Sequence, residues 1–434
     1  MQHSAQATRR WPISQHATAV LLLAGMAQAL SLAWPFDGAF KGDAQGWLQC
    51  MSLAVLAFHI DRSQSGKEAF VKAWVFALAW LAGSIWWLFI SMHRYGGLAA
   101  PVAGLAVGLM AGGLALFYAA AAAVYHAICK TGVGVLPRAG AFAAVWVLAE
   151  MVRGTLWTGF PWGAVGYAHV DSLLQHWAPW MGVYGLCALS AFMAMAVAAE
   201  RKDNRPTTRA TQLVVAAIVA VLGYTWFMSP SQSVDEEALS KKPLSVTLLQ
   251  GNIPQDLKFG EGVSLALRDY REALLSSTSD LTVTPETAIP LIQQQMPERY
   301  WSQLETHFSK GKQAALIGLP LAQRSEQGQL QYSNSAIALM PQTTPASTAS
   351  YQYDKHHLVP FGEFVPPLFQ WFVRMMNIPL GDFNRGDVAQ PSFVFKGERI
   401  APNICYEDLF GEELARSFAD PDKAPTLMVN LSNI

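Results

Sequence analysis

Residues 401–408 read APNICYED, and Cys405 is the only cysteine of the chain that lies outside a long apolar run. A short strand-like segment, Ser392 to Ile400, precedes it, and the carboxylates Glu407 and Asp408 follow. This order predicts a thiol where a strand ends and a helix begins. A thiol at a helix N-terminus has a lowered pKa, because the dipole and free N–H groups favour the thiolate. An isolated cysteine is nevertheless more often structural than nucleophilic, and the two carboxylates could simply cap the helix, so this stretch alone leaves both interpretations open.

The composition indicates a membrane protein with more than one domain. The chain has 434 residues, of which 52% are hydrophobic and only 14% charged. This is long enough for two or three domains and too apolar for an ordinary soluble protein. The formal net charge of −1 gives no electrostatic case for nucleic acid. Cys50, Cys129 and Cys187 lie in apolar runs, and no Cys or His group has metal-ligand spacing, so we expect no metal, no cofactor and no disulfide.

Up to about residue 230, apolar stretches of roughly membrane length alternate with short polar breaks. About 20 apolar residues cross the hydrocarbon core of a bilayer. Residues 1–230 are therefore predicted to form a transmembrane domain of about seven helices. A cleaved signal peptide is the alternative for the first stretch, but the pattern that follows favours an uncleaved anchor. The predicted spans are 17–36, 44–60, 73–92, 97–127, 139–152, 177–199 and 211–229.

Basic residues are unequally shared between the two sides of these spans. The N-terminus and every second loop hold eleven Lys or Arg, whereas the alternating loops hold three, Lys41, Arg94 and Arg153. Positive charge stays on the cytoplasmic side, so the N-terminus is predicted to be cytoplasmic. Seven crossings then place everything after residue 230 outside, which in a bacterium is the periplasm. The eleven are Arg9, Arg10, Arg62, Lys67, Lys72, Lys130, Arg138, Arg201, Lys202, Arg205 and Arg209.

A polar linker, residues 231–242, separates this half from a second one with a different character. Short apolar strands in residues 243–434 are separated by helical stretches such as 262–276 and 297–309. Strands that alternate with helices indicate an α/β sandwich or sheet rather than an all-β domain. The predicted strands are 244–250, 281–286, 314–320, 335–340 and 426–432.

Candidate catalytic residues follow three of the strand-like segments. TVTPETAIP (282–290) places Glu286 after a strand, YDKHHLVPFGEF (353–364) places Lys355 in a polar loop, and NICYED (403–408) contains Cys405. A carboxylate near the thiol could take its proton, and a lysine could stabilise an oxyanion, so the three suit acyl transfer. A loop Glu or Lys is otherwise usually just solvated, and His356 and His357 are interpreted as polar loop residues.

The same three motifs, PE, YDKHHLVPFGE and ICYED, resemble in order and spacing the Glu, Lys and Cys motifs of the nitrilase (carbon–nitrogen hydrolase) superfamily. Together with further stretches of the chain, they resemble the apolipoprotein N-acyltransferases of Gram-negative bacteria, from about residue 17 to the C-terminus. The resemblance implies a polytopic α-helical membrane domain followed by a nitrilase-like α-β-β-α sandwich. The further stretches are GSIWWLFISMHRYGG (83–97), TGFPWGAVGY (158–167), WAPWMGVYGL (177–186) and LLQGNIPQDLKF (248–259).

The resemblance also implies a role for each motif residue. It assigns Glu286 as general base, Lys355 as the residue that stabilises the oxyanion, and Cys405 as nucleophile. Phe259 stands where some members of the family have a tryptophan, so an aromatic contact can survive but an indole N–H bond cannot. The positions implied to support the site or bind substrate are Phe259, Asn334, Glu363, Tyr406 and Glu407.

The implied reaction moves an acyl chain from phospholipid, through a Cys405 thioester, to the α-amino group of the lipid-modified N-terminal cysteine of apolipoproteins. The implied setting is the bacterial inner membrane, with a monomeric enzyme and no nucleic-acid partner. A membrane-tethered amidase or nitrilase that hydrolyses a C–N bond remains an alternative. The apolar stretch 365–383 favours the lipid reaction, as a lid that dips into the membrane interface, although core packing explains it equally well.

The end of the chain leads to a further expectation. The sequence stops at TLMVNLSNI, and Ile434 stands where the family has an acidic residue followed by further strands, helices and a membrane span. A sandwich without its final part leaves sheet edges unpaired and apolar faces exposed. We therefore expect a copy truncated at the C-terminus, for which an inactive remnant is the third alternative.

Overall fold

The structure is a computed structural model, and it describes residues 13–129, 133–200, 223, 243–253, 260, 262–324, 327–341, 350–365 and 383–433. The chain divides into two compact units, Met1–Ser233 and Val234–Ile434. The first is built of helices and the second of sheets and helices.

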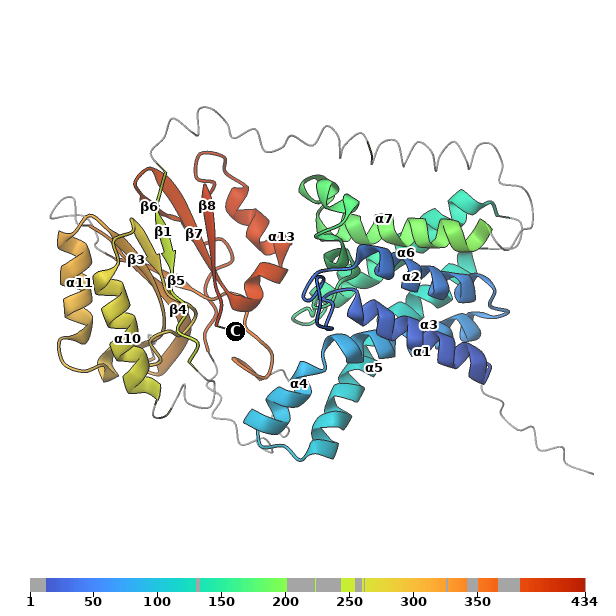
Figure 1. The fold of residues 1–434 in the computed structure, drawn as a ribbon, viewed down its shortest axis with the longest axis horizontal. Coiled ribbons are helices and arrows are strands. Elements are labelled where there is room, and N and C mark those ends of the chain that lie inside the picture. Colours follow the sequence, from blue (N-terminus) through green and yellow to red (C-terminus); the bar gives the residue numbers. More distant parts are fainter. Residues whose placement is uncertain are drawn as a thin grey trace, which may run out of the picture. The chain divides into compact units, whose positions relative to one another are not determined.

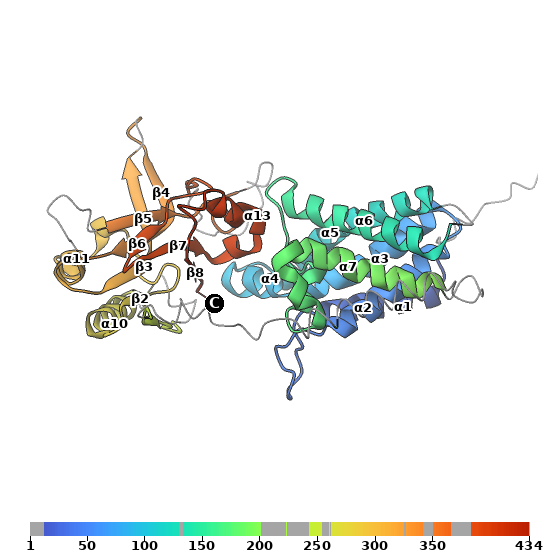
Figure 2. The ribbon, with the colours of Figure 1, turned by 90° about the horizontal axis from the view of Figure 1, so that it is seen from above.

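The first unit is a bundle of long helices that run side by side (Figures 1 and 2). Serine side chains begin two of them, since Ser14 accepts from the Ala17 N–H and Ser65 from the Glu68 N–H. The rings of Trp80, Tyr118 and Trp146 pack together in the core, with centroids 4.8–6.0 Å apart. The helices are α1 (Gln15–Leu30), α2 (Gly46–Asp61), α3 (Gly66–Ser84), α4 (Trp87–Ile90), η1 (Ser91–Tyr95), α5 (Ala100–Ile128), α6 (Val135–Thr155), η2 (Val165–His169), η3 (Leu173–Trp177) and α7 (Ala178–Glu200).

Several of these helices are suited to cross a membrane. In the part of the chain that is described, Ala100–Ile128, Val135–Thr155 and Leu173–Ala199 are long and apolar enough to do so. A fourth candidate is the pair Gly66–Ser84 and Trp87–Tyr95, which is bent by 53°. The helices α1 and α2 have only 16 residues each. The predicted span 211–229 lies outside the described residues apart from Gly223, so a total of seven spans stays a prediction.

The second unit contains two β-sheets, and Figure 1 shows them stacked face to face. The five-stranded sheet has the order β1-β2-β3-β4-β5, parallel from β1 to β3 and antiparallel from β3 to β5. In the three-stranded sheet β6 is antiparallel to β7, and β7 is parallel to β8. The strands are β1 (Val246–Leu248), β2 (Leu281–Val283), β3 (Ala314–Arg324), β4 (Leu330–Leu339), β5 (Ser350–Asp354), β6 (Phe393–Phe395), β7 (Glu398–Ile404) and β8 (Leu427–Leu431).

Helices cover both outer faces of the sheet pair. The helices α10 (Gly262–Ser276) and α11 (Tyr300–Lys310) lie on the five-stranded sheet, and α13 (Gly411–Leu414) lies beyond the three-stranded one (Figure 1). One apolar cluster fills the space between the sheets and another joins α10 and α11 to β3 and β4. Because both faces of β3 are covered, its first six residues are buried and apolar, without polar alternation. The layers confirm the predicted α-β-β-α sandwich. The short helical segments are η4 (Gln293–Gln295), η5 (Cys405–Leu409) and η6 (Ala415–Phe418).

Candidate active site

Three strands end at one place in the second unit and deliver the three candidate residues there. Glu286 follows β2 by three residues, Lys355 comes directly after β5, and Cys405 comes directly after β7. The first two belong to one sheet and the third to the other. The site therefore lies where the ends of strands from both sheets meet.

Lys355 is held between two carboxylates. Its Nζ atom lies 3.2 Å from Glu286 Oε1 and 3.0 Å from Glu363 Oε1, and its side chain is only 1% exposed. Asn334, on β4, donates from Nδ2 to the same two oxygens, at 2.7 and 2.6 Å. A buried charge needs such partners, because an unpaired one is strongly destabilising. The four side chains form one connected polar cluster.

The two carboxylates keep the lysine charged. Burial by itself lowers the pKa of Lys355, but the negative charges of Glu286 and Glu363 outweigh it and raise the pKa above its ordinary value. The side chain is therefore an ammonium ion at neutral pH. A buried ammonium is suited to stabilise an anion that forms beside it.

Cys405 has an uncommon backbone conformation. Its φ is +54°, in the left-handed region that a non-glycine residue rarely adopts and that often occurs at functional sites. Its carbonyl oxygen accepts a hydrogen bond of 3.0 Å from Asn430 Nδ2 on the neighbouring strand β8. This contact fixes the turn in which the direction of the chain changes after β7.

The predicted lowering of the thiol pKa is wrong. Burial and the negative charge of Glu286 raise the pKa of Cys405 to about 12, although the charge of Lys355 acts in the opposite direction. The nearby Glu286 carboxylate therefore favours the protonated form of the thiol. The sequence correctly placed the thiol at the start of a helical segment, but η5 is a five-residue 3-10 turn. Its dipole is too small to offset burial beside a carboxylate.

Glu407 joins the loop that carries Lys355 to the turn that carries Cys405. Its Oε1 atom accepts from the main-chain N–H groups of His356 and His357, at 2.7 and 3.1 Å. Its Oε2 atom accepts from the N–H of Ile404 at 2.7 Å and from the Tyr353 hydroxyl at 2.9 Å. The carboxylate is thus a cap for η5, as one interpretation of the sequence had it, and also a link between two loops.

The other predicted site residues have different surroundings. Tyr406 is buried and packs its ring against those of Phe410, at 5.0 Å, and His357, at 5.6 Å. Glu363 and Asn334 belong to the cluster around Lys355. Phe259 and residues 366–382 of the apolar stretch lie outside the described part of the chain, and so does Ile434.

Sequence reasoning missed two asparagines that hold the main chain of the site. Asn430 binds the Cys405 carbonyl, and Asn433 donates from Nδ2 to the carbonyl oxygen of Glu286 at 3.1 Å. The sequence did contain a sign of this role. Asn430 lies in the last predicted strand and Asn433 just after it, and neighbouring parallel strands end at the same edge of a sheet, so both could have been expected near the site.

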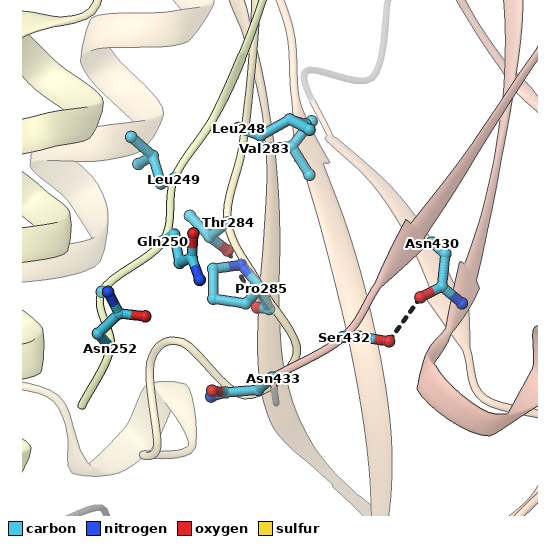
Figure 3. Close-up of a pocket in the computed structure, with 11 residues that line it drawn as sticks. Leu248, Leu249, Gln250, Asn252, Val283, Thr284, Pro285, Asn430, Ser432 and Asn433 are labelled. Carbon is cyan, nitrogen blue, oxygen red and sulfur yellow. Dashed lines mark hydrogen bonds between the residues drawn. The ribbon is translucent and has the colours of Figure 1, made fainter. Parts of the chain in front are cut away.

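A cavity of about 220 Å³ adjoins these asparagines, at the ends of β1, β2 and β8. Figure 3 shows its side chains, with Asn430 and Ser432 joined by a hydrogen bond. Apolar groups from β1 and β2 line one part, and amides and hydroxyls line the rest. The lining residues are Leu248, Leu249, Gln250, Gly251, Asn252, Val283, Thr284, Pro285, Asn430, Ser432 and Asn433.

Comparisons with known proteins match both units of the chain. The protein-family model described as "Apolipoprotein N-acyltransferase N-terminal domain" matches residues 14–196, and the one described as "Carbon-nitrogen hydrolase" matches residues 245–425. Among solved structures, a carbon-nitrogen hydrolase from Helicobacter pylori G27 is similar at 16% identity and a TM-score of 0.28, over 44% of this chain and 59% of that one. That likeness is too slight to carry an argument.

Curated relatives are similar over nearly the whole chain. The apolipoprotein N-acyltransferase of Verminephrobacter eiseniae is 48% identical over 425 residues, which are 95% of this chain and 76% of the relative. The one from Ralstonia nicotianae is 41% identical over 401 residues, 91% of this chain and 73% of the relative. The expectation of a truncated copy is not borne out by these matches. The resemblance seen in the motifs is confirmed: the chain belongs to the apolipoprotein N-acyltransferase family.

Proposed function

We propose that this chain transfers an acyl group from phospholipid to the α-amino group of lipoproteins, with Cys405 as nucleophile, Glu286 as general base and Lys355 as oxyanion stabiliser. The enzyme is an acyltransferase, since its relatives carry the name apolipoprotein N-acyltransferase. The observation that supports these roles best is the meeting of a thiol, a carboxylate and a buried ammonium at the ends of three strands. Asn334, Glu363, Tyr406 and Glu407 are proposed as supporting residues, and no cofactor takes part.

The first half-reaction forms a thioester. A thiol whose pKa is about 12 is almost fully protonated at neutral pH, so Glu286 takes its proton as the sulfur attacks the ester carbonyl of the phospholipid. The carbonyl oxygen becomes an oxyanion, which the Lys355 ammonium stabilises. The C–O bond of the ester then breaks. Glu286 returns the proton to the departing alkoxide, and the lysophospholipid leaves as an alcohol.

The second half-reaction forms an amide. The neutral α-amino group of the acceptor attacks the thioester carbonyl, and Glu286 takes a proton from the nitrogen. Lys355 again stabilises the oxyanion. When the C–S bond breaks, the proton on Glu286 passes to the sulfur, which restores the thiol and leaves the N-acylated acceptor.

The protein is a membrane protein, as its apolar helices and its family membership indicate. We infer that it resides in the bacterial inner membrane as a monomer, with a cytoplasmic N-terminus and a periplasmic catalytic domain. The asymmetry of basic residues supports this orientation. The proposed organisation is a transmembrane domain of about seven helices at 1–230, a linker at 231–242 and a nitrilase-like catalytic domain at 243–434. Lipid substrates require a site within reach of the bilayer.

Neither alternative function is favoured by the comparisons. A hydrolase would use the same three residues with water as the acceptor, but the relatives from Verminephrobacter eiseniae and Ralstonia nicotianae are both named as acyltransferases. An inactive remnant would need no intact cluster around Lys355, yet the ion pairs and hydrogen bonds there are all formed.

The test follows the acyl group through both half-reactions. Membranes that contain the full chain are given phospholipid with a labelled acyl chain, and the protein is then treated with hydroxylamine, which cleaves thioesters. We expect hydroxylamine-sensitive label on the unmodified chain and none on Cys405→Ala. Addition of a diacylglyceryl-cysteine peptide should move the label to its amino group. Release of labelled fatty acid without transfer to the peptide would instead identify a hydrolase, and absence of label from protein present in full amount would refute the proposal.

A further inference from the structure

His357 is a buried ring that packs between the two loops of the site. It is 5% exposed and comes two residues after Lys355. Its ring stacks on Phe410, with centroids 3.4 Å apart and planes 18° apart, and meets the edge of the Tyr406 ring at 5.6 Å. His357 does lie in a loop, as the sequence indicated, but a solvated histidine would have neither contact. His357 is part of the core beneath the site.

Glu413, on α13, binds the same ring through its polar edge. His357 Nδ1 lies 3.1 Å from Glu413 Oε1 and 3.2 Å from Oε2, so the nitrogen faces the middle of the carboxylate. Burial of Glu413 works against its ionisation, but the bond to His357 and the charges of His357, His356 and Arg416 together outweigh burial and lower the pKa of the carboxyl. The preceding residue, Glu412, is exposed and makes no such contact.

The pair lies close in the chain to both reacting residues. Residues 405–418, which we name the post-cysteine segment, begin at the nucleophile and contain Tyr406, Phe410 and Glu413. Glu407 already ties the start of this segment to the main chain of the lysine loop, through the N–H groups of His356 and His357. That link anchors the start of the segment, where the Cys405 carbonyl is also held by Asn430. The contact between His357 and Glu413 attaches the segment to the lysine loop a second time, on the short helix α13 that follows Phe410.

We propose that His357 and Glu413 form a positioning pair, which locks the post-cysteine segment against the lysine loop and so sets the separation between the Cys405 thiol and the Lys355 ammonium. The part of this proposal that concerns acyl transfer rests on the function proposed above. Neither residue touches the reacting atoms, and both act through the loops that carry them. Displacement of about 1 Å in such a site can reduce a rate about 100-fold.

Three variants of the full chain in membranes test the proposal. Glu413→Ala removes the contact, Glu413→Gln retains an oxygen that can accept from a neutral His357 Nδ1–H, and Glu412→Ala is the matched control on the same short helix. The initial rate of thioester formation on Cys405 is measured against phospholipid concentration. We expect Glu413→Ala to reduce the maximal rate about 10- to 100-fold with an unchanged half-saturating concentration. Glu413→Gln should recover most of the rate, and Glu412→Ala should match the unmodified chain.

Alkylation of Cys405 by iodoacetamide provides a readout that needs no lipid. If Lys355 moves away from the thiol, it stabilises the thiolate less, so alkylation should also slow in Glu413→Ala and recover in Glu413→Gln. This result would support the positioning pair even if the unmodified chain formed no thioester with labelled phospholipid. Failure to form the thioester would count only against the proposed acyltransferase function. Equal alkylation in Glu413→Ala and Glu412→Ala would overturn the positioning role. An equal loss in Glu413→Ala and Glu413→Gln, with a lowered unfolding temperature in both, would also overturn it, because it indicates a purely structural role.

Discussion

The charge on Glu286 should affect the two reactions of Cys405 in opposite directions. In the free enzyme, this charge and burial together raise the pKa of the thiol to about 12. In the acylation reaction, the same carboxylate is proposed to take the thiol proton. Glu286→Gln removes the charge and the base while it keeps the shape of the side chain, and Lys355 keeps a carboxylate partner in Glu363 at 3.0 Å. The substitution should therefore speed alkylation by a simple electrophile and slow acylation by phospholipid.

The size of the first effect follows from Coulomb's law. Two unit charges about 4 Å apart interact by about 4 kcal/mol at an effective dielectric constant of about 20. This corresponds to about three pKa units, which is the largest fall that loss of this charge can give to the thiol pKa of about 12, since burial, the larger cause, remains. The thiolate fraction then rises at most about 1,000-fold, but a less basic thiolate is a weaker nucleophile, with a Brønsted coefficient of about 0.45. The net gain in alkylation rate is at most on the order of 40-fold.

The assay follows the Cys405 peptide by mass spectrometry after timed exposure to iodoacetamide at pH 8. Identification of the peptide separates Cys405 from the three other cysteines, and Cys405→Ala gives the background. The same preparations are assayed for thioester formation, which should fall about 100- to 10,000-fold without the general base. Alkylation that is unchanged or slower in Glu286→Gln would refute the reasoning, because the carboxylate would then not oppose the thiolate. Acylation that persists in Glu286→Gln would show that Glu286 is not the general base.

Three further substitutions test other contacts. Arg153→Met leaves the fully buried Glu150 without its ion-pair partner at 2.7 Å. The free energy of unfolding, measured by thermal unfolding, should fall by about 3–5 kcal/mol. Most of this loss should be recovered in the double variant Arg153→Met, Glu150→Gln. Glu407→Ala leaves four donors without their acceptor and should lower the free energy of unfolding by about 3 kcal/mol or more, measured by denaturant titration, with a smaller loss for Glu407→Gln. Gly318→Ala brings a Cβ atom against the carbonyl oxygen of Pro285, and this should displace the turn that carries Glu286, the proposed general base. Its rate of thioester formation should fall about 100-fold while the amount of protein in the membrane is unchanged.

The architecture could be predicted because each half of the sequence has a clear pattern of apolar residues. Apolar stretches of membrane length mark the helices of the first unit, and six of the seven predicted spans coincide with described helices or overlap them. In the second unit, the alternation of short strands with helices indicated an α/β sandwich or sheet, and the resemblance of the motifs to the nitrilase superfamily implied the α-β-β-α sandwich. Strand ends were less accurate. The segment from 281 to 286 was predicted as one strand, but β2 ends at Val283, since Pro285 has no N–H group to continue a ladder.

The contacts between the site loops could not be predicted, because they depend on which strands are neighbours. Each candidate residue was recognisable as a residue after a strand. Sequence patterns do not show that β5 and β7 lie in different sheets, or that Glu407 reaches across to the N–H groups after Lys355. His357 illustrates the same limit. The sequence around it indicated a polar loop residue, and only the fold brings Phe410 and Glu413 to its ring.

The raised thiol pKa fits a nucleophilic role when the charges of the whole site are counted. With a neutral thiol, Glu286, Glu363 and Lys355 together carry one net negative charge. A free thiolate would add a second negative charge in a place where charge is costly, which is why burial and Glu286 hold the thiol protonated. Attack coupled to proton transfer avoids this second charge. In the proposed reaction, the proton neutralises Glu286 as the oxyanion forms beside Lys355, so the net charge stays the same from the resting state to the tetrahedral intermediate. A nucleophile of this kind gains its reactivity only when an ester is in place, and this keeps the thiol from reacting before the lipid has bound.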